Sequence, residues 1–133
     1  MGQPNLVRCR DIVPKAFASR ETRVLAGAGG LPAERFVLGY VVIQPGGEVP
    51  GHAHQQEEVY FALEGRGEMV VGDAACPLEA LSAVYIPSGI YHALTNVGEA
   101  PLAFVFAYAP GGEVSHWAQE AAALQPVAGE RDA

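Results

Sequence analysis

The stretch Gly46–Gly65 reads GGEVPGHAHQQEEVYFALEG and places His52, His54 and Glu58 within seven positions. In an extended strand, residues two apart face the same side about 6.6 Å apart, so the two imidazoles can converge on one ion. Glu58 has the same even parity and follows a short QQE segment, so its carboxylate reaches the same point if the chain bends there. The spacing therefore predicts three metal ligands. The alternative is a set of solvated polar side chains where a loop enters a strand.

The segments on both sides of this stretch indicate an all-β fold. Sixteen Gly and ten Pro separate short runs rich in Val, Tyr and Phe, which is typical of strands joined by tight turns. Strands are expected from Phe36 to the turn at Pro45, in a hairpin around the EGRG turn, on both sides of the PSG turn, and within APLAFVFAYAP at 100–110. The helix formers of EVSHWAQEAAAL then predict a short C-terminal helix, followed by a frayed tail.

The length and charge of the chain narrow the classes of function. With 133 residues, half of them hydrophobic, the sequence predicts one domain. A net charge of −7 with no basic cluster argues against nucleic acid and anionic membranes as partners. No signal peptide or long apolar run is apparent, so a cytoplasmic location is expected. Cys9 and Cys76 show no metal-binding spacing, and two reduced thiols are expected.

The spacing Gly46, His52, His54, Glu58, Gly65 resembles the first motif of the cupin superfamily, and all five positions fit. Neutral imidazoles with one carboxylate also suit a transition metal better than calcium, which prefers more oxygen ligands.

A second cupin motif resembles the later part of the chain at Pro87, Gly89, His92 and Asn96. Its opening glycine is replaced by Leu81, which predicts a different turn at that point. Asn96 is interpreted as a turn former. The remaining histidine, His116, lies outside both motifs and is expected at the surface or at a helix cap.

The resemblance implies a double-stranded β-helical barrel of the jelly-roll type over residues 31–112. It also implies one divalent transition metal, either Fe, Mn, Ni, Cu, Co or Zn, bound by His52, His54, Glu58 and His92. Small single-domain cupins commonly pair, so a homodimer is expected. Residues 1–30 would then form strands or an arm at the dimer interface, because they lack an obvious partner inside a minimal barrel. Residues 113–133 would form the short helix and tail.

Strand parity predicts the walls of the pocket. Tyr60 shares the parity of Glu58, and Phe104, Phe106 and Tyr108 form a second wall. No Arg or Lys is expected on the inward strand positions, which disfavours phosphorylated and dicarboxylate substrates.

Three functions fit such a site. The first is an oxygenase acting on a small enolic, phenolic or diketone-like substrate. The second is a non-redox lyase, isomerase or cyclase, with Tyr60 or Tyr91 as acid or base. The third is a binding protein that takes up a metal or a small molecule without turnover. Because cupins host all three, the fold does not choose among them.

Overall fold

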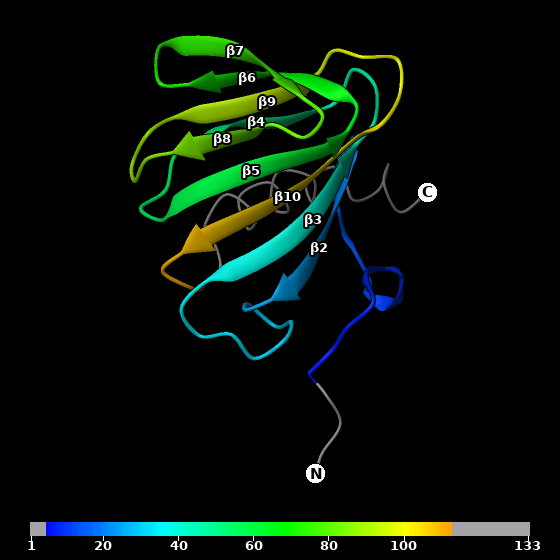
Figure 1. Ribbon diagram of the computed structural model, residues 1–133, viewed down its shortest axis with the longest axis vertical. Helices are drawn as coiled ribbons and strands as arrows, with labels where there is room; N and C mark the ends of the chain where they lie inside the picture. Colours follow the sequence, from blue (N-terminus) through cyan, green and yellow to red (C-terminus); the bar gives the residue numbers. More distant parts are fainter. Residues whose placement is uncertain (1–4, 113–133) are drawn as a thin grey trace, which may run out of the picture.

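The computed structural model describes residues 5–112, which form two antiparallel sheets packed face to face (Figure 1). One sheet has six strands in the order β1-β2-β3-β10-β5-β8, and the other has four in the order β4-β9-β6-β7. The elements are η1 (Cys9–Asp11), β1 (Lys15–Ala16), β2 (Arg20–Ala26), β3 (Val37–Ile43), β4 (Glu48–His52), β5 (Glu57–Glu64), β6 (Arg66–Val71), β7 (Ala74–Glu79), β8 (Ala83–Ile86), β9 (His92–Asn96) and β10 (Leu102–Ala109).

This architecture confirms the predicted all-β barrel of the jelly-roll type. The helix expected within 113–133, together with His116, lies outside the described residues. Between residues 5 and 112, no helix is long and apolar enough to cross a membrane.

The core lies between the inner faces of the two sheets. Strand β10 has the predicted alternation, with Phe104, Phe106 and Tyr108 buried and the residues between them half-buried. The ring of Phe104 lies 4.6 Å from the ring of Tyr60 on the neighbouring strand β5. Inward side chains of two stacked sheets interdigitate in this way to form one continuous core.

The predicted hairpin around the EGRG turn is wrong, although both of its strands exist. Strand β5 pairs with β8 and β10, whereas β6 pairs with β7 and β9 in the other sheet. Gly65 joins them with a φ of 83°, and a Cβ there would lie 2.6 Å from the carbonyl oxygen of Pro101. The glycine therefore carries the chain from one sheet to the other. The pattern of residue types in the sequence shows that these two strands exist, but it does not show which other strands they pair with.

The N-terminal segments also differ from expectation. Strand β2 pairs with β3 and β1 pairs with β2, so these strands do have partners within the same chain. Together they extend the six-stranded sheet at one edge.

Leu81 occupies the left-handed region that the motif glycine would favour, with a φ of 66°. The leucine thus adopts a backbone conformation for which glycine is better suited. The backbone N–H of Leu81 donates to the carbonyl of Ala62 at 2.8 Å, and its side chain is 74% exposed. The exposed side chain gains little stabilisation from packing, while a Cβ in the left-handed region costs about 1–2 kcal/mol.

Replacing Leu81 with glycine is therefore expected to stabilise the protein by about 0.5–1 kcal/mol, after allowing for the greater freedom of glycine in the unfolded chain. The measurement is urea unfolding of both proteins under the same conditions. Leu81→Ala is the matched control, because it removes the exposed side chain and keeps the Cβ. Equal stability of the glycine and alanine variants would contradict the strain argument.

Asn96 fastens the two sheets together at one end of the barrel. Its side-chain amide donates to the carbonyls of Ile43 at 2.9 Å and Ala100 at 3.0 Å, and its Oδ1 accepts the N–H of Gly98 at 2.9 Å. Only 1% of the residue is exposed. The structure thus agrees with its interpretation as a turn former, since these bonds hold the turn after β9 against the end of β3.

Candidate metal centre

Three histidines converge at the other end of the barrel. His52 is the last residue of β4, His54 lies in the loop that follows, and His92 is the first residue of β9. His52 and His92 are cross-strand partners, and the ligand nitrogens of the three rings lie within 4.8 Å of one another. The expected pairing of His52 and His54 on one strand is only half right, because the strand ends before His54.

Each of these rings is anchored to the backbone through its Nδ1 atom. The Nδ1 to carbonyl oxygen distances are 2.7 Å from His52 to Pro50, 3.0 Å from His54 to Gln56 and 2.9 Å from His92 to Ile90. A carbonyl oxygen only accepts, so each Nδ1 must donate its proton. This fixes the tautomer in which Nε2 carries a lone pair, the arrangement that metal-binding histidines usually show.

Glu58 borders the cluster from the six-stranded sheet. It lies on β5 with 6% of its surface exposed, and its Oε1 lies 3.1 Å from Nε2 of His54 and 3.4 Å from Nε2 of His92. The bend needed to bring this carboxylate to the histidines is the loop between β4 and β5. The structure thus brings together all four residues expected as ligands.

The electrostatics of the cluster are set by burial and by the carboxylate. Burial is the main cause that lowers the pKa of His52 to about 4, so its imidazole is neutral at pH 7. Burial also acts to lower the pKa of His54, but the hydrogen bond and charge of Glu58 outweigh it and raise that pKa. Burial acts to raise the pKa of Glu58, while the hydrogen bonds and charges that His54 and His92 offer in their protonated forms outweigh it and lower that pKa. Glu58 is therefore a carboxylate.

The donor set fits a transition metal. Within residues 5–112, the buried Nε2 of His92 has no hydrogen-bond donor when Nδ1 holds the ring proton, because the nearby Oε1 of Glu58, 3.4 Å away, only accepts as well. An unsatisfied buried nitrogen costs free energy unless another group, such as a metal ion, satisfies it. Three imidazole nitrogens with a nearby carboxylate suit Fe, Mn, Ni, Cu, Co or Zn. The histidine cluster is therefore suited to hold a metal ion.

Aromatic side chains line the interior beside the cluster. The ring of Tyr60 lies 6.2 Å from the ring of His92, and the ring of Tyr108 lies 6.1 Å from the ring of His54. Both tyrosines are buried, as strand parity predicted. Tyr91 differs, because it is 52% exposed and its hydroxyl lies against Gly51 on the outer side of the strand pair. Of the two tyrosines expected as acid or base, only Tyr60 faces the interior.

One buried cation was not expected. Arg20 is 5% exposed at the start of β2, where its guanidinium lies 4.2 Å from the ring of Phe17. Arg20 pairs with Ile43, which in turn pairs with Leu102. Leu102 lies six positions along β10 from Tyr108, the residue beside the cluster. That separation is roughly 20 Å along the strands. The expectation of no inward cation is wrong for the barrel as a whole, but Arg20 is remote from the histidines.

Sequence reasoning missed the three anchoring carbonyls. Each belongs to a residue two positions from its histidine. Backbone groups carry no residue-specific signal, so nothing in the side-chain pattern indicates them.

Comparison with known proteins assigns the family. Residues 39–117 match the model of the cupin domain, which is more than half of the chain. The chain belongs to the cupin family.

Known cupins and other relatives resemble this cupin to different extents. It is 28% identical over 109 residues to a protein named polyketide synthase CurC from Streptomyces cyaneus, covering 81% of this chain and 71% of the relative. A cupin structure from Shewanella frigidimarina aligns with a TM-score of 0.71 at 14% identity, covering 84% of this chain and 95% of that one. A predicted oxalate decarboxylase from Thermotoga maritima aligns with a TM-score of 0.67 at 22% identity, covering 79% and 98%. These two structural matches support the fold alone.

Proposed function

We propose that this cupin is a metal-dependent oxygenase that acts on a small enolic, phenolic or diketone-like substrate. The observation that carries the proposal is the set of three histidines whose Nδ1 atoms are fixed by backbone carbonyls, with their Nε2 atoms gathered beside the ionised Glu58. His52, His54, His92 and Glu58 would hold one divalent ion. The ion would supply Lewis acidity and, in a redox-active form, the electron transfer needed to activate oxygen.

The walls favour a planar, largely apolar substrate. Tyr60 and Tyr108 lie beside the rings of His92 and His54, Phe104 packs against Tyr60, and each of these three aromatic residues is less than 5% exposed. Such walls exclude water and bind flat molecules. With Arg20 at the far end of the barrel, the described residues offer no buried guanidinium beside the histidines for a phosphate or a second carboxylate.

The chain's own residues divide the remaining tasks. Glu58 supplies negative charge beside the Nε2 atoms of His54 and His92, whose rings the backbone carbonyls orient. Tyr60, which is buried and next to His92, is the proposed acid or base for the substrate.

A second function is favoured by the relative named as a polyketide synthase, since polyketides carry β-diketone, enol and phenol groups. The same groups can also undergo cyclisation or bond cleavage that needs no oxygen and is catalysed by a metal ion acting only as a Lewis acid. A non-redox cyclase, lyase or isomerase is therefore the alternative at the same site.

The test is to load the protein separately with Fe(II), Mn(II), Ni(II) and Zn(II) and to supply chelating phenols and β-diketones with and without oxygen. We expect oxygen uptake that matches product formation in a redox-active form and stops with zinc. Turnover that continues without oxygen, or with zinc, would instead support the non-redox alternative.

The same assay tests the role of Tyr60. We expect Tyr60→Phe to lower turnover at least about 100-fold, the usual contribution of a positioned acid or base, and Tyr91→Phe to retain it. Equal loss in both variants, or loss only in Tyr91→Phe, would contradict the assignment.

A further inference from the structure

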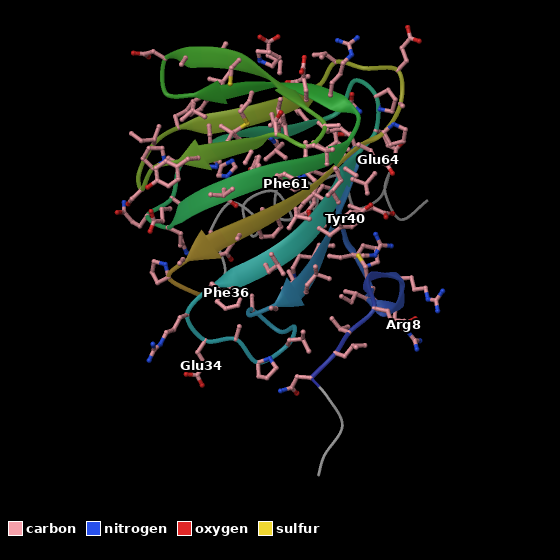
Figure 2. All side chains as sticks on the ribbon, in the orientation of Figure 1. Arg8, Glu34, Phe36, Tyr40, Phe61 and Glu64 are labelled. Atoms are coloured by element: carbon pink, nitrogen blue, oxygen red, sulfur yellow. The ribbon has the colours of Figure 1, made fainter. Side chains whose placement is uncertain are left out.

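Two loops cross between the sheets at the histidine end of the barrel, and they contact each other. Loop 53–56 carries the chain from β4 of the four-stranded sheet to β5 of the six-stranded sheet, and loop 87–91 carries it back from β8 to β9. Both loops lie at the left in Figure 1, whereas Glu64, labelled in Figure 2, ends β5 at the opposite end. The first loop contains His54, and the second leads directly into His92. The relative position of the two loops therefore affects how these two histidines face each other.

The second loop is built around a tight turn at Pro87–Ile90. The N–H of Ile90 donates to the carbonyl of Pro87 at 3.2 Å, and Gly89 has a φ of 77°. A positive φ at the third position is what a type II turn requires, and glycine adopts it without strain. The turn directs two neighbouring donors, the hydroxyl of Ser88 and the N–H of Gly89, at the first loop.

These two donors meet two neighbouring carbonyls. The hydroxyl of Ser88 donates to the carbonyl of Gln55 at 2.5 Å, and the N–H of Gly89 donates to the carbonyl of His54 at 2.7 Å. The next carbonyl along the loop, that of Gln56, accepts Nδ1 of His54 at 3.0 Å. The turn thus holds the part of the first loop whose carbonyl orients the His54 ring.

The same turn carries the anchor of a second histidine. The carbonyl of Ile90, its last residue, accepts Nδ1 of His92 at 2.9 Å. The anchors of His54 and His92 therefore lie on two segments that the turn joins, and the centroids of the two rings are 4.9 Å apart. His52 differs, because its anchor is the carbonyl of Pro50 within β4.

We propose that Ser88 is a positioning residue that sets the relative orientation of His54 and His92 for a metal ion. This inference rests on the proposed function in that both histidines would be ligands. Ser88 is exposed, so its hydrogen bond adds little to the stability of the whole fold. Its effect is local: without the hydroxyl, the first loop can rotate about the bond from Gly89 that remains, and the carbonyl of Gln56 moves with it. An ion that needs both nitrogens in fixed positions then binds less tightly.

The test is competition titration of Co(II) against a chelator of known affinity, with the full-length protein. We expect Ser88→Ala to raise the dissociation constant about tenfold, the lower end of the loss for groups that orient a metal ligand. Ser88→Thr keeps the hydroxyl and should restore the affinity of the wild type. Gln55→Ala is the matched control, since it removes a side chain but keeps the accepting carbonyl. Equal affinity of Ser88→Ala and wild type would overturn the proposal, and so would a loss that Ser88→Thr does not recover.

Two measurements on the metal-free protein separate positioning from a general effect on folding. Ser88→Ala should unfold at the same urea concentration as the wild type, as most surface substitutions do. The imidazole nitrogen resonances of His54 and His92 should shift in this variant, whereas those of His52 should not. A lowered urea midpoint, or equal shifts at all three histidines, would mean that Ser88 acts on the fold as a whole and would overturn the proposal.

These readouts need no turnover, so the role of Ser88 and the proposed function can fail separately. A wild-type protein that binds Co(II) and oxidises none of the phenols or diketones would contradict the oxygenase, while a tenfold weaker Ser88→Ala would still establish the positioning role. A wild-type protein that binds no divalent ion would contradict both.

Discussion

Replacing His92 with alanine is expected to lower the affinity for a divalent transition metal by at least about 100-fold. Loss of groups that merely orient a ligand costs 10- to 100-fold, and loss of a ligand itself should cost no less. His52→Ala and His54→Ala should behave in the same way, since the three rings have equivalent anchors. The measurement is elemental analysis after purification, together with competition titration against a chelator of known affinity.

The matched control for these variants is Gln55→Ala. Gln55 lies in the same loop as His54, but its side chain is exposed. It should keep full metal occupancy. An ion that binds only the folded protein stabilises it. When the free metal concentration is 100 times the dissociation constant, the free energy of unfolding of the wild-type protein should therefore rise by about 2.7 kcal/mol. The melting temperature of the wild-type protein should rise accordingly when metal is added, whereas the melting temperatures of the three histidine variants should not change. Full occupancy of both His52→Ala and His92→Ala at limiting metal would refute the assignment of the ligands.

Replacing Asn96 with alanine is expected to destabilise the protein by about 3 kcal/mol. Three hydrogen bonds are lost at a site with 1% exposure, and each contributes about 1 kcal/mol or more when its partner is left unsatisfied. Denaturant unfolding with a metal chelator present measures this contribution separately from metal binding. Thr95→Ala is the control, since Thr95 is half-buried on the outer side of the same strand and should cost less than about 1 kcal/mol.

Asn96→Asp tests the direction of these bonds. The carboxylate keeps the shape of the amide but has no N–H to offer the carbonyls of Ile43 and Ala100, and burial opposes its charge. The pKa of this aspartate should therefore be higher in the folded than in the unfolded state. The deficit relative to wild type should shrink as pH falls and the carboxyl becomes protonated. A deficit that grows on acidification would mean that the amide is not the donor.

Most of the candidate metal site could be predicted from the sequence, because three of its four residues lie close together in the chain. His52, His54 and Glu58 lie within seven positions, and strand parity with one bend is enough to bring them together. His92 is 34 positions beyond Glu58, and only the resemblance to a known motif placed it in the same site. Its cross-strand pairing with His52 depends on the register between β4 and β9, which no local pattern encodes.

The features that sequence did not predict depend on non-local or weak signals. Strand β7 was not predicted because its sequence AACPLE has poor strand propensity and buries only Leu78, so no alternation appears. The left-handed conformation of Leu81 has no signal in a leucine, which rarely adopts it. The burial of Arg20 depends on the aromatic ring and the carbonyl oxygen that tertiary packing brings to it.

The proposed ligands come from both sheets, and this has a consequence for how the protein opens. His52 and His92 belong to strands of the four-stranded sheet, whereas Glu58 belongs to the six-stranded sheet. At the opposite end, the contact between Asn96 and Ile43 joins the sheets whatever the supply of ions. A bound ion would thus join the two sheets at the histidine end as well, where without it only the contacts of Glu58 with His54 and His92 cross between them. When metal is scarce, local opening, and with it access for proteases and for an incoming ion, is therefore expected at the histidine end.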